Sequence, residues 1–281
     1  MKTKITFVIL HYLNVKDTIQ CIESILSNIK YDNYNIIVVD NGSPNYTGKK
    51  LYDKYEKEDK VYVLLSKENL GFANGNNLGY LYAKKNYGSD FIILINNDTI
   101  IEQKDFCNKI ISIYNSSSFD ILGPKIKSLV DGYNQNPVPY VFKTKLKVIK
   151  RILSYSLKYI ILFLPVIKKF SFEKKYHFHK NIPEEYQLHG CCLIFSKNYI
   201  KRFNGLCNRT YMYCEEDFLK YYTIKYNLKM MYSEDIIIYH KEGSATKSLN
   251  NSSIKSMRFF YKYNIMSLIE LLKTMIFNLE I

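Results

Sequence analysis

The stretch FIILINNDT, residues 91–99, decides the fold class of this 281-residue chain. Five apolar residues, Phe91–Ile95, run without interruption and end abruptly in Asn96–Asp98. Such a run is typical of a strand that is buried on both faces of a parallel sheet. Ile36–Val39 has the same character and ends in DNGSPN, residues 40–45, a turn-forming cluster. Both stretches therefore predict central strands of an α/β sheet.

Strand and helix patterns alternate around these two strands. Apolar runs predict further strands at Ile5–Leu10 and Val61–Leu65, and residues 15–29 carry apolar side chains at helical spacing. Further helices are expected within residues 47–87. Residues 1–128 therefore predict a doubly wound, mostly parallel sheet flanked by helices, and such sheets bind ligands beyond the carboxyl ends of their strands.

The composition excludes several classes of protein. The chain is 47% hydrophobic, with eleven Gly and six Pro, which excludes a disordered, collagen-like or low-complexity chain. Its formal net charge of +14 suggests a nucleic-acid or membrane partner. No nucleic-acid-binding motif is present, and the acidic triplet Glu215–Asp217 would repel phosphate, so we expect no nucleic-acid partner. Six cysteines without a CxxC pair, and no signal-peptide core or eighteen-residue apolar run, predict a cytoplasmic protein without a transmembrane helix.

Residues 129–185 form a basic insertion. Eleven Lys and Arg residues and a single Glu lie between Val141 and Lys180. The apolar segment Ile152–Ile167 is too short to span a bilayer, but its flanking cations suit an interfacial helix on anionic lipid. The alternative is a basic surface insertion whose apolar residues pack on the core.

The second half of the chain carries further candidates for chemistry. The globular pattern returns over residues 186–250, and residues 251–281 predict a C-terminal helical segment. Glu215–Asp217 open a helix, where burial could raise one pKa and make a general base, although acidic residues at helix starts are usually only caps. In the first half, Asp98 follows an apolar strand, where it suits a hard divalent ion or is simply part of a turn. The chain has no P-loop and no GxGxxG after its first strand.

Seven stretches, taken in chain order, resemble family 2 of the glycosyltransferases. They are FVILHYLN (7–14), IIVVDNGS (36–43), NLGFANGNNLG (69–79), FIILINNDT (91–99), HGCCLIFSK (189–197), YMYCEEDF (211–218) and IYHKEGSAT (238–246). The resemblance covers roughly residues 3–128 and 186–264, and is greatest to rhamnosyltransferase-like bacterial enzymes that build surface polysaccharides. It implies the GT-A fold and the transfer of a sugar, with inversion, from a nucleoside diphosphate to a saccharide acceptor.

The resemblance also implies roles for individual residues. Asp217, paired with Glu216, would be the catalytic base, and Asp98 and His240 would hold Mn²⁺ or Mg²⁺. The donor would be bound by His11, Tyr12, Asp40, Asn69, Gly71, Asn74, Asn77 and Asn97, and the acceptor and donor-sugar pocket would be bordered by His189 and Gly190. Asn96 stands where a full DxD motif has its first Asp, so the metal site is a variant with one charge fewer.

The acceptor is left open by the sequence. Enzymes of this type often act on a lipid-linked saccharide, which fits the basic insertion and implies a peripheral location on the inner face of the cell membrane. A soluble or protein acceptor is the alternative among enzymes. A non-catalytic GT-A scaffold and a basic nucleic-acid-binding protein are the alternatives outside that class.

Overall fold

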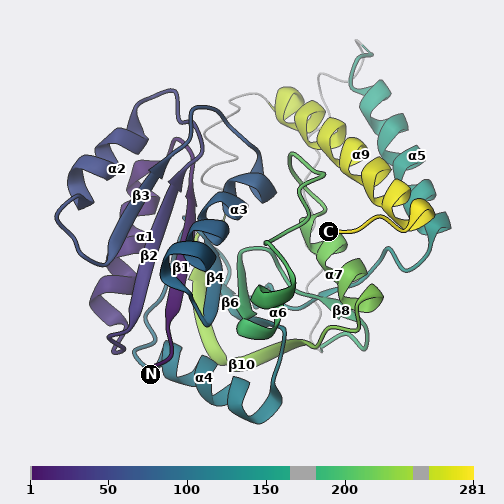
Figure 1. Cartoon of the computed structure of the whole chain (residues 1–281). Coiled ribbons are helices and arrows are strands. Elements are labelled where there is room, and N and C mark those ends of the chain that lie inside the picture. The colour runs from purple at the N-terminus through teal and green to yellow at the C-terminus, as the bar shows by residue number, and fades with distance from the viewer. Residues whose placement is uncertain (1, 165–181, 243–252) are drawn as a thin grey trace.

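The computed structural model describes residues 2–164, 182–242 and 253–281. In these ranges the chain forms an eight-stranded sheet in the order β3-β2-β1-β4-β9-β6-β10-β5, and a two-stranded sheet of β7 and β8. The strands are β1 (Ile5–His11), β2 (Tyr34–Asp40), β3 (Val61–Leu65), β4 (Phe91–Asn96), β5 (Thr99–Ile100), β6 (Ile121–Ser128), β7 (Val138–Pro139), β8 (Tyr186–Gln187), β9 (Cys192–Ser196) and β10 (Met230–His240). The helices are α1 (Val15–Asn28), α2 (Thr47–Tyr55), α3 (Phe72–Tyr82) with a π-helical turn at Ala83–Tyr87, α4 (Phe106–Ser117), α5 (Lys145–Ile161), α6 (Lys197–Arg202), α7 (Glu215–Lys225) and α9 (Ser253–Phe277). Figure 1 shows these elements.

The sheet is mostly parallel, as the sequence predicted. Strands β3, β2, β1 and β4 run parallel to one another, and β6 runs parallel to β10. Strand β9 pairs antiparallel with both β4 and β6, and the short β5 pairs antiparallel with β10. Because Leu10 lies opposite Asn96 and His11 opposite Asp40, the carboxyl ends of the three central parallel strands lie at one edge of the sheet.

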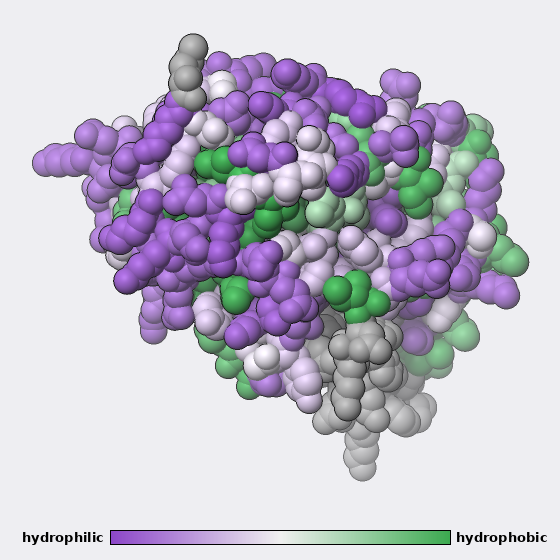
Figure 2. Space-filling view, turned by 90° about the horizontal axis from the view of Figure 1, so that it is seen from below, coloured by the Kyte–Doolittle hydropathy of each residue, from purple (hydrophilic) through white to green (hydrophobic). Residues whose placement is uncertain are grey.

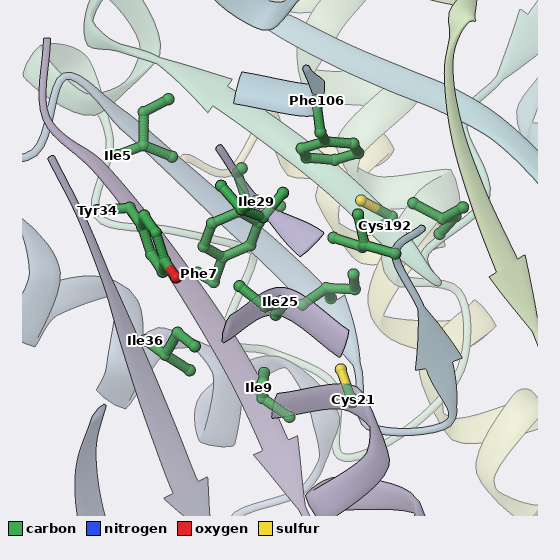
Figure 3. Packing of buried hydrophobic residues seen from close by; sticks show 14 of the residues in the cluster. Ile5, Phe7, Ile9, Cys21, Ile25, Ile29, Tyr34, Ile36, Phe106 and Cys192 are labelled. Carbon is green, nitrogen blue, oxygen red and sulfur yellow. The ribbon is translucent and has the colours of Figure 1, made fainter. Parts of the chain in front are cut away.

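Apolar side chains pack on both faces of this sheet. On one face Phe7 and Ile9 of β1 pack with Ile25 of α1 and Phe106 of α4, as Figure 3 shows. On the other face Val8 and Val39 pack with residues of α3 and α6. Because side chains alternate along β1 to two covered faces, the strand is apolar from Phe7 to Leu10, and the buried Thr6 bonds to the Ser89 hydroxyl.

The N-terminus of α1 is capped as its sequence predicts. The side chain of Asn14 accepts a hydrogen bond from the Asp17 backbone N–H. The first helix expected within residues 47–87 is α2, which ends at Tyr55, where the chain enters a turn before β3.

The basic insertion builds a helix that packs against the C-terminal helix. Helix α5 begins at Lys145, earlier than the predicted Ile152, because the Thr144 side chain caps it by accepting from the Lys147 N–H. Its inward face is buried through Val148, which packs in one cluster with Leu268 and Leu271 of α9. The end of the predicted helix, residues 165–167, lies outside the described residues. In the described ranges, no helix combines the length and the apolar character needed to cross a membrane.

Candidate functional site

A cavity of about 610 Å³ lies beyond the carboxyl ends of the central strands, within the size range of small-molecule sites. Ten of the fourteen predicted site residues line it, and they come from both halves of the chain: Tyr12, Asn69, Gly71, Asn97, Asp98, His189, Gly190, Glu216, Asp217 and His240. Asp98 and Asp217, which lie far apart in the sequence, therefore line the same cavity. The role of each residue stays a prediction.

Asp98 and His240 meet at the end of the sheet. His240 ends β10 opposite Thr99, which places its Nε2 3.2 Å from Oδ1 of Asp98. The other ring nitrogen, Nδ1, lies 2.8 Å from the Oε1 atom of Gln135. An amide oxygen only accepts hydrogen bonds, so Nδ1 carries the hydrogen and, in the neutral ring, the Nε2 lone pair faces the carboxylate. Two acceptors at this distance need a cation with them, either a proton or a metal ion.

Asp98 and His240 together suit a metal ion that both side chains would bind. A histidine that donates its second N–H to an oxygen is the usual arrangement of a metal-binding imidazole. Among the residues described, no group of three or more potential metal ligands occurs. A divalent ion held by Asp98 and His240 would therefore take its other ligands from phosphate oxygens and water, as Mg²⁺ commonly does.

The loop before β9 is held by Glu216 and His189. The Gly190 N–H donates to Oε1 of Glu216 over 3.0 Å, and a Cβ atom at this glycine would lie 2.6 Å from that oxygen. The Cys191 N–H donates to Nδ1 of His189 over 3.1 Å, so the hydrogen of the neutral ring lies on Nε2. Burial lowers the pKa of His189, which favours the neutral ring. Glu216 thus shapes the cavity wall, and His189 supplies a neutral hydrogen-bond donor.

Asp217 stands in the first turn of α7, where a tight bend aims it at the cavity. Tyr213 and Cys214, with φ of 72° and 65°, are both left-handed, and they reverse the chain before the helix. Burial and the neighbouring Glu216 raise the pKa of Asp217 to about 7, although a hydrogen bond with Gln187 and the charge of Arg151 act in the opposite direction. A carboxylate whose pKa lies near neutrality is suited to act as a general base.

Glu215 is the third carboxyl of the triplet. It is buried, and burial together with Glu216 raises its pKa to about 8. Crowding of three carboxyls thus keeps part of the triplet protonated near neutral pH.

Asn41 organises the loop that follows β3, and the sequence analysis missed it. Its Nδ2 donates to Oδ1 of Asn69 and to the Gly71 carbonyl, both over 3.1 Å, and its Oδ1 accepts from the Leu70 N–H. The feature of the sequence that could have indicated Asn41 is its position directly after Asp40, the last residue of β2. Gly71 has φ of +83°, and a Cβ atom there would lie 2.1 Å from the Tyr211 carbonyl oxygen. Position 71 therefore requires glycine. Its close contact with Tyr211 joins the loop after β3 to the segment that precedes α7.

His11 and Asp40 are not among the residues that line the cavity, and their expected contact with the donor stays a prediction. His11 is fully buried, and its two ring nitrogens bond to Thr18 and Thr47. Burial lowers its pKa to about 4, so the ring is neutral. Asp40 lies 4.0 Å from that ring, and burial raises its pKa. Side chains alternate along a strand, so when Tyr12 faces the cavity His11 faces the interior.

Asn74 and Asn77 also lie outside the cavity. Asn77 donates to the carbonyl of Leu206 and accepts from the N–H of the same residue, and Asn74 donates to the Asn208 carbonyl. Both therefore attach α3 to the loop after α6. Positions three apart on a helix share a face, and this face points away from the strand ends.

Helices α5 and α9 supply a second wall that the sequence did not indicate. Arg151 and Tyr155 of α5 and Phe259 and Leu268 of α9 line the cavity. The spacing of four between Arg151 and Tyr155 was the available signal, because it places both on one helix face.

Comparisons with known proteins show the family and the fold of this chain. The family model for glycosyl transferase family 2 matches residues 6–200. Poly-beta-1,6-N-acetyl-D-glucosamine synthase of Staphylococcus aureus strain MSSA476 is 34% identical over 99 residues, which are 35% of this chain and 23% of that protein. The protein of the same name in strain COL is 33% identical over 99 residues, again 35% and 23%. The matched segment thus spans less than a quarter of these relatives.

Solved structures with the same fold include TarS of S. aureus. The crystal structure of its residues 1–349 matches with a TM-score of 0.55 and 16% identity, over 97% of this chain and 66% of that one. Its complex with UDP-GlcNAc matches with a TM-score of 0.56 and 16% identity, over 99% and 68%. At this identity the likeness concerns the fold, and it confirms the predicted GT-A architecture.

Proposed function

Because the chain belongs to glycosyltransferase family 2, we propose that it transfers a sugar from a nucleoside diphosphate to a saccharide acceptor, with inversion, in the synthesis of a bacterial surface polysaccharide. One observation carries this proposal: Asp98 and His240, at the strand ends, share a cavity with Asp217, a half-buried carboxyl on α7. Inversion requires the base and the leaving group on opposite sides of the sugar. The presence of two separate acidic centres in one cavity supports this proposal.

Asp217 takes the proton of the acceptor hydroxyl as that oxygen attacks the anomeric carbon. The bond to the diphosphate breaks as the new bond forms, so the proton passes to the carboxylate and the charge to the leaving group. A pKa of about 7 leaves a large share of Asp217 ionised at neutral pH while keeping it basic.

Asp98 and His240 would hold the divalent metal, Mn²⁺ or Mg²⁺. Such an ion would stabilise the negative charge on the departing diphosphate. Gln135 fixes the ring of His240 so that Nε2 is turned toward Asp98. His189, with its donor nitrogen in the same cavity, would hydrogen-bond to the donor sugar or diphosphate.

Tyr12, Asn69, Gly71 and Asn97 would bind the nucleoside end of the donor, since they line the cavity at the ends of β1, β3 and β4. The complexes of TarS with UDP and with UDP-GlcNAc favour a uridine nucleotide as the first donor to test.

The experiment is metal-dependent thermal stabilisation by a panel of UDP-, GDP- and dTDP-sugars, followed by assay of sugar release and transfer. A bound donor raises the melting temperature by mass action. We expect one nucleotide class to stabilise the protein only with Mn²⁺ or Mg²⁺, and to be turned over. A donor that binds but is neither hydrolysed nor transferred would favour the non-catalytic scaffold.

The acceptor we propose is lipid-linked, and the enzyme works at the inner face of the cell membrane. The supporting feature is an exposed apolar ridge along α5, defined as Leu146 (59% exposed), Ile149 (39%), Leu153 (65%), Leu157 (61%) and Ile160 (61%). Spacing of three and four residues places all five on one face. Lys145, Lys147, Lys150 and Lys158 flank the ridge, and no acidic residue lies between Lys143 and Leu164.

This ridge suits the boundary of an anionic bilayer. Apolar side chains enter that boundary, and each flanking cation adds about 1 kcal/mol near an anionic surface. In Figure 2 most of the visible face is hydrophilic, and hydrophobic residues stand both near its middle and along the right-hand edge, the side on which Figure 1 places α5 and α9. The opposite face of α5 packs on α9, so docking leaves the fold intact.

Vesicle flotation tests the ridge. The wild type should float with vesicles that contain phosphatidylglycerol and remain in solution with phosphatidylcholine alone. The double variant L153Q/L157Q should lose flotation, whereas Leu65→Gln, a half-exposed leucine at the end of β3, should keep it. Equal flotation of the double variant and the wild type would contradict the docking face.

A further inference from the structure

Arg151 is an unmatched cation in an acidic cavity. Of the described residues that line the cavity, it is the one Lys or Arg, whereas Asp98 and the triplet Glu215–Asp217 supply four carboxyls. No carboxylate in the described ranges lies within ion-pair distance, 4.0 Å, of its guanidinium. An arginine that lines a cavity and has no carboxylate partner is a candidate contact for an anionic ligand.

The guanidinium is held in place by an aromatic wall. Its Nη1 donates to the Tyr155 hydroxyl over 3.1 Å, and its central carbon lies 5.3 Å from the centre of that ring and 5.8 Å from the centre of the Phe142 ring. Within the part of the chain described, Tyr155 is the one hydrogen-bond partner of this group. Because a guanidinium has five N–H donors, most of them remain available to a ligand.

Arg151 lies on the side of the cavity that holds the base. Its charge is among those that act on Asp217, and Tyr155, its hydrogen-bond partner, packs in one apolar cluster with Cys214 and Phe218 of the segment that carries Asp217. Asp98 and His240, which suit the donor diphosphate, belong to the strand ends. The cation is therefore placed for the acceptor and not for the leaving group.

We propose that Arg151 binds a phosphate oxygen of the acceptor, so that the acceptor is a saccharide carrying a phosphate group beside the sugar that is extended. This inference rests on the proposed glycosyl transfer and deepens it. A planar guanidinium matches two phosphate oxygens, and the aromatic side chains beside it suit the face of a sugar ring.

The same helix links this subsite to the ridge. Arg151 faces the cavity, and Leu153, two positions along α5, is 65% exposed on the opposite side. A bilayer at the ridge would bring its headgroup layer, where a lipid-linked phosphate lies, to the helix that carries Arg151. A soluble sugar phosphate has the same recognition chemistry, so the test separates the two sources.

The test is a binding measurement in the presence of UDP and Mn²⁺, which fill the donor site. The probes are glucose 1-phosphate, glucose, a dodecyl-diphosphate glucoside and dodecyl glucoside. We expect each phosphate-bearing probe to bind about 10–100-fold more tightly than its partner without phosphate, the range of a charged hydrogen bond. Preference for the dodecyl-diphosphate glucoside over glucose 1-phosphate identifies a lipid-linked source, and equal affinity identifies a soluble one.

Variants of Arg151 then test whether this residue causes the preference for phosphate-bearing probes. Arg151→Gln should abolish the phosphate preference, and Arg151→Lys should keep part of it, because the charge remains and the two-pronged contact is lost. Lys85→Gln removes a positive charge from an exposed position outside the cavity and should leave the preference unchanged.

Three results would overturn the proposal. They are equal binding of probes with and without phosphate by the wild type, an undiminished preference in Arg151→Gln, and a loss of UDP affinity in that variant, which would move Arg151 to the donor site. The wild-type comparison needs no variant, so it holds even if Arg151→Gln fails to fold. Failure of any nucleotide to bind with metal would instead refute the proposed function.

Discussion

Asp217→Asn should make the protein inactive and, at alkaline pH, more stable. The substitution keeps the shape of the side chain, but it removes the charge. As a general base, Asp217 contributes about 10²–10⁴-fold to the rate, so transfer should fall by that factor while donor binding persists.

The stability effect follows from the raised pKa. The carboxyl ionises near 3.8 in the unfolded chain and near 7 in the fold, so between these values the folded state binds more protons and stability falls as pH rises. Each pH unit in that window costs about 1.4 kcal/mol. From pH 5 to pH 8 the wild type should therefore lose about 2–3 kcal/mol through this group. The Asp217→Asn variant should not lose this stability, because its side chain does not ionise.

Thermal unfolding of both proteins at pH 5 and pH 8 measures the effect. The melting temperature of the variant minus that of the wild type should be about 4–8 °C greater at pH 8 than at pH 5. Asp59→Asn, an exposed carboxyl in the turn before β3, should change neither activity nor this difference. A variant that is inactive and destabilised equally at both pH values would mean that Asp217 is structural, and the reasoning would be refuted.

Three further predictions concern the same cavity. The value of kcat/KM should rise about tenfold per pH unit below pH 7 and level off above it, as the carboxyl of Asp217 loses its proton; a pH-independent rate from 5 to 8 would exclude it as the base. Gln135→Ala should raise the Mn²⁺ concentration for half-maximal activity about 10–100-fold, because it releases the ring of His240, and an unchanged metal titration would remove His240 from the site. Gly71→Ala should destabilise the protein by more than the roughly 1–2 kcal/mol expected for Gly132→Ala, measured by urea unfolding, because both have positive φ but only Gly71 faces a carbonyl oxygen at 2.1 Å; equal losses would contradict the close approach.

The sheet was predictable because its strands carry an unambiguous pattern. Buried parallel strands such as Phe91–Ile95 must be apolar on both faces, and the polar residues that follow them must gather at one edge. This rule predicted that Asp98 would lie at the ligand-binding edge of the sheet. The resemblance to family 2 added Asp217 and His240, since no local pattern links a helix start to a strand end more than a hundred residues away.

Contacts made by side chains at the end of a loop or helix were not predictable. Asn77 belongs to a polar string after β3, yet its amide bonds twice to Leu206, a partner 129 positions along the chain. His11 ends β1 beside Tyr12, and only the direction of each side chain decides which faces the ligand. Arg151 was counted with the surface charge of the insertion, because the packing of α5 on α9 that turns it inward is a tertiary contact.

The most direct test is a crystal structure of the protein with Mn²⁺ and the nucleotide sugar that stabilises it. We expect the metal on Asp98 and His240, in contact with the diphosphate, and the anomeric carbon turned toward Asp217. A donor bound elsewhere, or a sugar whose reacting carbon faces away from α7, would contradict the claim that these two acidic centres serve one ligand.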